Sequence, residues 1–241
     1  MARKVLIIYG ALMLLTLGLT YLVSLGDTRT LREVGIWVKP MKFMAATVLF
    51  AWTTVWLAQL CAPPVSQSQP FAWIAALLIL TSLFEVTYIT YHAALGAGSH
   101  YNNSDPLHAF MFGLMGLAAV GLTATQGWLA WVIWKTHGPQ PMSLLTLGVV
   151  TGLVMTFLLA TFSGFLLGAH QPPAGVGLPW LGWHGQHDQR PAHFLGVHAQ
   201  QIIPMGAWTA QRFCGRFALN AFVTGVILYV LAWATLTGLS T

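Results

Sequence analysis

Charged residues are scarce in this chain of 241 residues. They make up 6% of it, whereas hydrophobic residues make up 56%, and the mean hydropathy is +0.70. Soluble domains carry about 25% charged residues, so this chain cannot cover a water-facing surface. The composition therefore predicts an all-α integral membrane protein whose main partner is the lipid bilayer.

Several motifs that would identify a soluble function are also absent. The two cysteines, Cys61 and Cys214, lie far apart and form no CxxC pair, so they indicate no redox compartment. Glycine-rich phosphate-binding, zinc-protease and serine-hydrolase motifs are missing, which removes nucleotide-driven and serine-hydrolase functions. The net charge of +5 is spread along the chain and gives no case for nucleic-acid binding.

Long apolar stretches fill most of the sequence. About 20 apolar residues cross a hydrocarbon core of about 30 Å as one helix. Seven stretches qualify, and the whole chain, 1–241, is expected to form one bundle of about seven transmembrane helices. They cover residues 5–25, 40–61, 71–95, 107–134, 142–169, 193–211 and 217–238. The first is too long for a signal peptide and lacks an A-x-A cleavage site, so we expect it to be retained.

The orientation follows from basic residues near the spans. With seven spans, five lysines and arginines lie at each end of the bundle, so the positive-inside count is a tie. The basic residues Arg3 and Lys4 at the start of the first span break this tie. We therefore place the N-terminus in the cytoplasm and the C-terminus outside.

Histidines gather at one end of the predicted bundle. Histidine is the commonest metal ligand, so this layer predicts a site for haem b or for a copper, iron or zinc ion. The alternative is that each histidine is an interfacial side chain bonded to loops and water. Only His137 falls at the other end. The layer contains His92, His100, His108, His170, His184, His187, His193 and His198.

The sixth stretch is unusually polar. At about 100° per residue, His193 and Gln200 share one face of a helix, while His198 and Gln201 share another. Polar groups facing lipid are costly, so this helix is expected inside the bundle. Gly196 would allow a second helix or a flat macrocycle to approach closely.

Glu85 is the only acid deep inside a predicted span. It forms a stripe with Tyr88 and His92, and an intramembrane carboxylate must be paired or protonated. It could act as a metal ligand, as a proton relay or as the partner of Lys39 or Lys42. A structural ion pair or a neutral acid is the alternative.

Two loops border the histidine layer. In the first, Asp105 is expected to cap the next helix, with Pro106 at its first position and with His100 and Asn102 over the bundle mouth. The loop 171–189 is rich in Pro, Gly and Trp. It is interpreted as a lid or as an interfacial anchor, two alternatives that the sequence leaves open. Its aromatic and imidazole side chains are Trp180, Trp183, His184 and His187.

Several features of the chain occur together: Lys39-Pro40-Met41-Lys42-Phe43, Glu85 in its apolar stretch, Ser99-His100-Tyr101-Asn102, Gly177-Leu178-Pro179 and the run from Arg190-Pro191-Ala192-His193 to Ala199-Gln200. In these features the chain resembles a widespread family of bacterial polytopic membrane proteins with no assigned activity. The resemblance covers the second to the sixth span, implies the bacterial inner membrane and supplies no reaction. It directs attention to Lys39, Lys42, Glu85, His100, Asn102, Arg190, His193 and His198. His92 stands where similar sequences have glutamine.

Three functions follow as hypotheses. The leading one is a membrane oxidoreductase or electron-transfer protein with His100, His193 and His198 as metal ligands, and with Asn102 and Gln200 beside the cofactor. Glu85 would relay protons, and Lys39, Lys42 and Arg190 would position a haem propionate, a quinone or a lipid head group. The second is a proton-coupled transporter or channel. The third is a subunit without chemistry of its own.

Overall fold

Long helices make up almost all of the computed structural model, which describes residues 1–61, 65–179, 181–185 and 187–239. The helices are α1 (Ala2–Gly26), α2 (Val38–Cys61), α3 (Gln69–Ala94), α4 (Pro106–His137), α5 (Leu144–Met155), α6 (Thr161–Ala169), α7 (Arg190–Phe213) and α8 (Ala218–Leu239). A π-helical turn, η2 (Thr156–Ala160), joins α5 and α6 into one continuous rod. The short turns η1 (Val65–Gln67) and η3 (Gly215–Phe217) precede α3 and α8.

Each predicted apolar stretch lies within one of these rods to within a residue or two. Six rods are long and apolar enough to cross a membrane, which confirms the all-α class and a multi-pass architecture. The rod outside this set is α7, which is 24 residues long but carries too many polar groups. A seventh span therefore stays a prediction.

Polar side chains cap α3, α4 and α5, and the cap of α4 is the one that the sequence predicted. The Asp105 carboxylate accepts a hydrogen bond of 3.0 Å from the His108 amide, and Pro106 opens α4, as predicted. Ser68 and Ser143 cap α3 and α5 in the same manner. Backbone N–H groups in the first turn of a helix have no acceptor within the helix, and these short side chains provide one.

A small hairpin joins α1 to α2. Strand β1 (Thr30–Leu31) pairs antiparallel with β2 (Val34–Gly35), with Thr30 opposite Gly35. The two turn residues, Arg32 and Glu33, have φ values of 53° and 67°, which is the geometry of a two-residue hairpin turn. The sequence analysis predicted only a loop here, because neither residue is the Gly or Asn usual in such turns.

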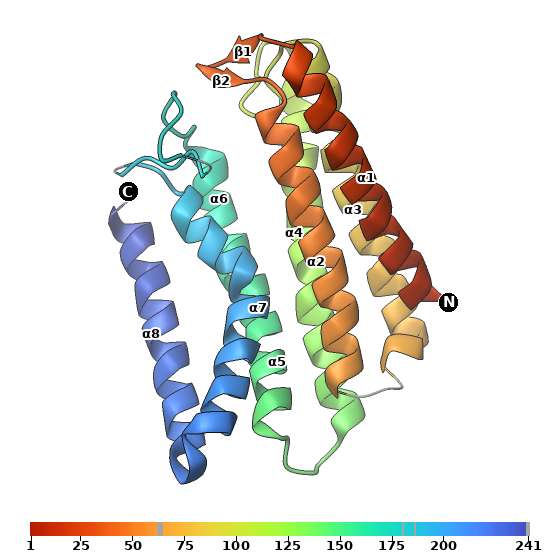
Figure 1. The fold of residues 1–241 in the computed structure, drawn as a ribbon, viewed down its shortest axis with the longest axis vertical. Helices are drawn as coiled ribbons and strands as arrows, with labels where there is room; N and C mark the ends of the chain where they lie inside the picture. The colour runs from red at the N-terminus through yellow and green to blue at the C-terminus, as the bar shows by residue number, and fades with distance from the viewer. Residues whose placement is uncertain (62–64, 180, 186, 240–241) are drawn as a thin grey trace.

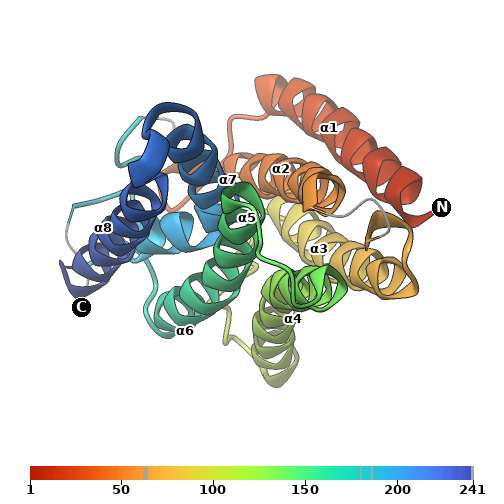
Figure 2. The ribbon, with the colours of Figure 1, turned by 90° about the horizontal axis from the view of Figure 1, so that it is seen from below.

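The helices form two groups that lie side by side (Figures 1 and 2). Helices α1 to α4 enclose the larger apolar core, while α7 packs between α5 and α8 around a smaller one. The hairpin, the loops 95–105 and 170–189 and the last turn of α8 all lie at one end, which we call the hairpin end. The linkers 138–143 and 214–217 lie at the other, which we call the N-terminal end.

Candidate functional site

Glu85 and Lys39 both lie at the hairpin end of the bundle, close enough for their charges to attract each other. Glu85 is only 6% exposed and lies nine residues before the end of α3 at Ala94. Lys39, on the first turn of α2, is its partner in electrostatic attraction. Of the two lysines that the sequence offered as partners of this carboxylate, the structure selects Lys39.

A chain of hydrogen bonds leads from Lys39 toward the surface. Its ammonium group donates to the Ser99 hydroxyl at 3.2 Å, and that hydroxyl lies 3.2 Å from Nδ1 of His100. Ser99 is 5% exposed. We call Glu85, Lys39, Ser99 and His100 the polar relay. A hydroxyl and an imidazole can each both accept and release a proton, so the relay is able to move protons.

The loop 95–105 holds His100 by inserting into the bundle mouth. The His100 ring lies 6.0 Å from the ring of Phe43 on α2 and 5.9 Å from that of Phe112 on α4. Burial, and next the charge of Lys39, lower the pKa of His100 to about 3, so its imidazole is neutral. Burial raises the pKa of Tyr101 to about 12, so its phenol stays protonated and donates to the Leu167 carbonyl on α6.

Two more cations lie beside this mouth, around Gly182. The Lys42 ammonium donates to the Leu181 carbonyl at 2.9 Å. A Cβ atom at Gly182 would lie 3.0 Å from that ammonium and 3.9 Å from a terminal nitrogen of Arg190. Lys42 and Arg190 therefore present their charges to the same small region, and each repels the other electrostatically.

A buried carboxylate fixes Arg190 in place. Asp188 is fully buried, and its oxygens accept from Nε of Arg190 at 2.7 Å and from a terminal nitrogen at 2.8 Å. Burial alone would raise the pKa of Asp188. Hydrogen bonds from Arg190 and from the His184 amide outweigh that effect and hold it below the usual value.

The loop 170–189 lies across the hairpin end and is tied down on two sides. Arg32 of the hairpin donates to the Pro172 carbonyl at 2.6 Å, and Lys42 of α2 bonds Leu181 as described above. These ties to α2 and the hairpin favour the lid interpretation over a plain anchor. Trp180 lies outside the described residues, so its predicted place in the lid stays a prediction.

The two polar faces of α7 contact different partners, as their helical spacing predicted. On one face, Nδ1 of His193 lies 3.2 Å from the Ser163 hydroxyl of α6, and the backbone N–H of Gln200 donates to the Thr156 hydroxyl at 2.8 Å. On the other, Nδ1 of His198 lies 3.3 Å from the Gln201 carbonyl oxygen. The Gln201 amide then donates to Thr53 of α2 at 3.1 Å.

α7 packs inside the bundle on its polar faces, as expected, but is exposed on its remaining side. Ala192, Gly196 and Ala207 are buried, but Met205 and Trp208 are 60% and 55% exposed. Small residues on one side let α5 and α8 pack closely, while the larger apolar side chains turn outward. The helix is therefore only half enclosed.

Gly196 serves helix packing. A Cβ at this position would lie 2.6 Å from the Ala160 amide nitrogen, so the π-helical turn η2 rests directly on the α7 backbone. The close approach that the sequence predicted is thus to a second helix. The other alternative weighed there, a flat macrocycle, has no place against this face of Gly196.

The three histidines predicted as metal ligands lie in three separate environments. His100 is in the loop mouth, His193 faces α6, and His198 stacks on Phe194 with ring centroids 4.1 Å apart. Among the described residues, no group of three or more His, Cys, Asp or Glu side chains could hold a metal ion. The arrangement does not fit one ion bound by all three. Asn102 bonds its own loop, through the Gly98 carbonyl at 3.2 Å.

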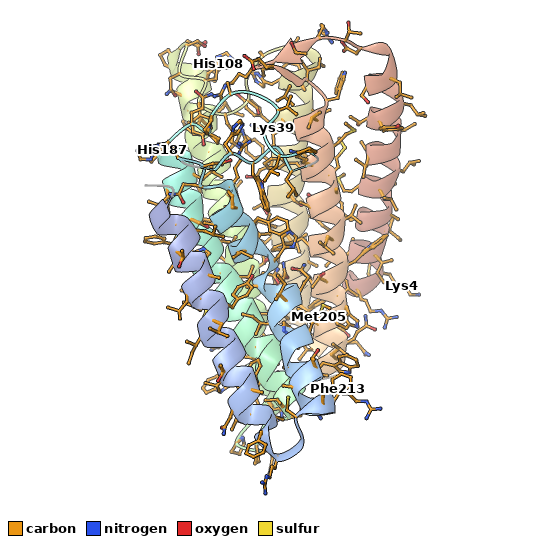
Figure 3. All side chains as sticks on the ribbon, turned by 60° about the vertical axis from the view of Figure 1, so that its left-hand side comes forward. Lys4, Lys39, His108, His187, Met205 and Phe213 are labelled. Carbon is orange, nitrogen blue, oxygen red and sulfur yellow. The ribbon has the colours of Figure 1, made fainter. Side chains whose placement is uncertain are left out.

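His92 forms a smaller cluster with His108 at the hairpin end. Their ring centroids are 5.4 Å apart, and Tyr88 lies 4.3 Å from His92 on the other side. Nδ1 of His92 is buried and has no hydrogen-bond partner among the described residues. Figure 3 shows His108, His187 and Lys39 at the same end of the molecule.

Several residues of the site escaped the sequence analysis. Ser99 bridges Lys39 and His100, Asp188 orients Arg190, and Thr53 and Ser163 bond the two faces of α7. Asp188 could have been found, since an acid two residues before an arginine is a common local ion pair. Ser99 lies in a segment that carries the family resemblance, but no role was assigned to it. Thr53 and Ser163 carry no signal, because serine and threonine also occur throughout membrane helices with their hydroxyls bonded to their own backbone.

Comparison with known proteins adds no relative. No family model matches the chain, and neither a curated protein nor a solved structure is significantly similar to it.

Proposed function

We propose that this chain is a seven-span protein of the bacterial inner membrane that couples proton uptake to the binding and movement of an anionic substrate. In this proposal α7 is the seventh span, the N-terminus is cytoplasmic and the hairpin end faces outward. The length of α7 and its packing alongside the apolar helices support the span count. The resemblance to a bacterial membrane protein family supports the location.

The observation that carries the proposal is that Lys39 interacts both with Glu85 and with the hydrogen bonds that lead to His100. It neutralises Glu85 by attraction and is hydrogen-bonded to Ser99 and thereby to His100. An anion that binds the Lys39 ammonium takes away the counter-charge of Glu85. A buried carboxylate without a counter-charge takes up a proton, because desolvation disfavours its ionised form. One negative charge and one proton then enter together, and the net charge of the site is unchanged.

The other cations select the substrate. Lys42 and Arg190 stand beside the mouth, and Asp188 neutralises only one of them. Arg190 keeps one edge of its guanidinium free of Asp188, a geometry that suits carboxylate or phosphate. The lid 170–189 would cover the occupied mouth, and the neutral His100 and Ser99 would pass the proton inward.

Proteoliposomes with a pH-sensitive dye inside test this function. Proton uptake is measured while a panel of carboxylate and phosphate anions is added outside. We expect at least one anion to drive proton entry, and Glu85→Gln to reduce entry to the level of protein-free liposomes. Asp105→Asn, which removes an exposed acid at the same end, is the matched control and keeps the flux. Flux that survives Glu85→Gln, or no flux with any anion, would contradict the proposal.

Haem- or metal-based redox chemistry, with a quinone or another lipophilic substrate, stays a prediction. One observation favours a single axial histidine: Gln201 orients Nδ1 of His198, and Nε2 has no hydrogen bond among the described residues. Ligating histidines are usually oriented in this way through the other ring nitrogen. A Soret band after haem-replete expression that is lost in His198→Ala would establish it, and its absence would remove the haem version.

A further inference from the structure

A groove between α5 and α7 at the N-terminal end stands apart from the proposed site. It encloses about 310 Å³ and is lined by Leu145, Trp208, Gln211 and Arg212. We call it the basic groove. Leu145 and the indole ring provide an apolar wall, while the other two side chains and the indole N–H provide hydrogen-bond donors.

Within the described part of the chain, these donors have no acceptor. Among the described residues, the Trp208 indole, the Gln211 amide and the Arg212 guanidinium make no side-chain hydrogen bond, and none of the three is buried. Arg212 lies 6.0 Å from the Phe213 ring, a loose contact that leaves its charge available. By contrast, Lys135 and Arg216 lie 4.9 Å and 4.8 Å from the rings of Trp131 and Phe217.

The charge around the groove is of one sign. The N-terminal end carries Arg3, Lys4, Lys135, Arg212 and Arg216, whereas all five acids of the chain belong to the hairpin end. The formal net charge of +5 therefore lies entirely at the N-terminal end. The groove also borders the first turn of α5, where the helix dipole favours a negative group.

We propose that the basic groove binds one anionic phospholipid, with its phosphate on Arg212 and Gln211 and its acyl chain along Leu145 and Trp208. A ligand that is acceptor-rich at one end and apolar at the other matches the lining. The charge complementarity at this end selects an anionic over a zwitterionic head group. A basic side chain near an anionic lipid surface contributes about 1 kcal/mol, which corresponds to about fivefold in affinity.

Native mass spectrometry of the purified full chain, with phosphatidylglycerol or phosphatidylcholine added to the detergent, tests the site. We expect one retained phosphatidylglycerol per chain and about fivefold lower occupancy by phosphatidylcholine. Arg212→Gln lowers phosphatidylglycerol occupancy to the phosphatidylcholine level, whereas Arg216→Gln, the matched loss of a charge at the same end, leaves it within about twofold.

A second variant separates the groove from diffuse charge. Leu145→Trp fills the groove without altering charge and should also lower phosphatidylglycerol occupancy. Equal losses in Arg212→Gln and Arg216→Gln, or full occupancy in Leu145→Trp, would overturn the proposal. Displacement of the lipid by free glycerol phosphate would do the same, because it would show that the acyl chain contributes nothing.

Discussion

The two ends of the bundle differ in how their basic residues are neutralised. At the hairpin end, five basic residues are matched by five acids. Arg190 pairs with Asp188, Arg29 pairs with Asp27 at 2.7 Å, and the charge of Lys39 attracts that of Glu85. At the N-terminal end, five basic residues have no acid at all and rest on aromatic rings or face outward. The first end is internally neutral and can be built into a site, whereas the second can be neutralised only from outside.

Breaking the most buried ion pair at the hairpin end should have the largest effect. Asp188→Ala leaves Arg190 without its counter-charge and the His184 amide without its acceptor. Removing one partner of a buried pair costs about 3 kcal/mol of unfolding free energy. Asp105→Asn, which breaks a pair that is 45% exposed on the acid side but keeps a capping side chain on α4, should cost clearly less. Thermal unfolding in detergent measures both, and equal losses would contradict the contrast.

Packing between the two ends should come next. Gly196→Ala places a methyl group against the η2 backbone, which cannot rotate away, and should cost about 1–3 kcal/mol. Gly206→Ala on the same helix has no atom within 4 Å of the new methyl group and should be neutral or slightly stabilising. A neutral Gly196→Ala would show that α7 and η2 are not in close contact.

Acid should weaken the hairpin end specifically. Burial and the charge of Lys39 lower the pKa of His100 to about 3 in the folded chain. Between pH 6.5 and this value, His100 binds a proton in the unfolded chain but not in the folded chain. Stability is therefore lost progressively as the pH falls from 6.5 toward 3. His100→Gln should flatten this dependence, measured as the unfolding midpoint at pH 7 and pH 5. Replacement of the exposed His170 by Gln serves as the control, and an equal change there would argue against the assignment.

The smallest effect is expected at the N-terminal end. Arg216 has no ion-pair partner among the described residues, so Arg216→Gln should change the unfolding free energy by less than about 0.5 kcal/mol. The same measurement on Asp188→Ala provides the scale. A loss above about 1 kcal/mol would contradict the contrast between the two ends, because it would mean that the charges of the N-terminal end are also paired.

The sequence predicted the helical architecture closely because length and apolarity decide it. Each of the seven stretches coincides with a rod, and Asp105 with Pro106 starts α4 as expected. The two faces of α7 followed from helical periodicity alone. Neighbouring helices decided what periodicity could not: one side of α7 is exposed, and His100, His193 and His198 face different partners.

By itself, then, the sequence determined the rods, the crowding of histidines and acids at one end and the presence of a buried carboxylate, since these depend on hydropathy and helical spacing. Only the tertiary structure decided that Lys39, rather than Lys42, is the lysine whose charge acts on Glu85, and that Ser99 connects Lys39 to His100. It also placed Arg212 in an apolar groove with no acid nearby. These are contacts between segments far apart in the chain, and the approach of α2, α3 and the loop 95–105 is set by packing, which no local pattern records.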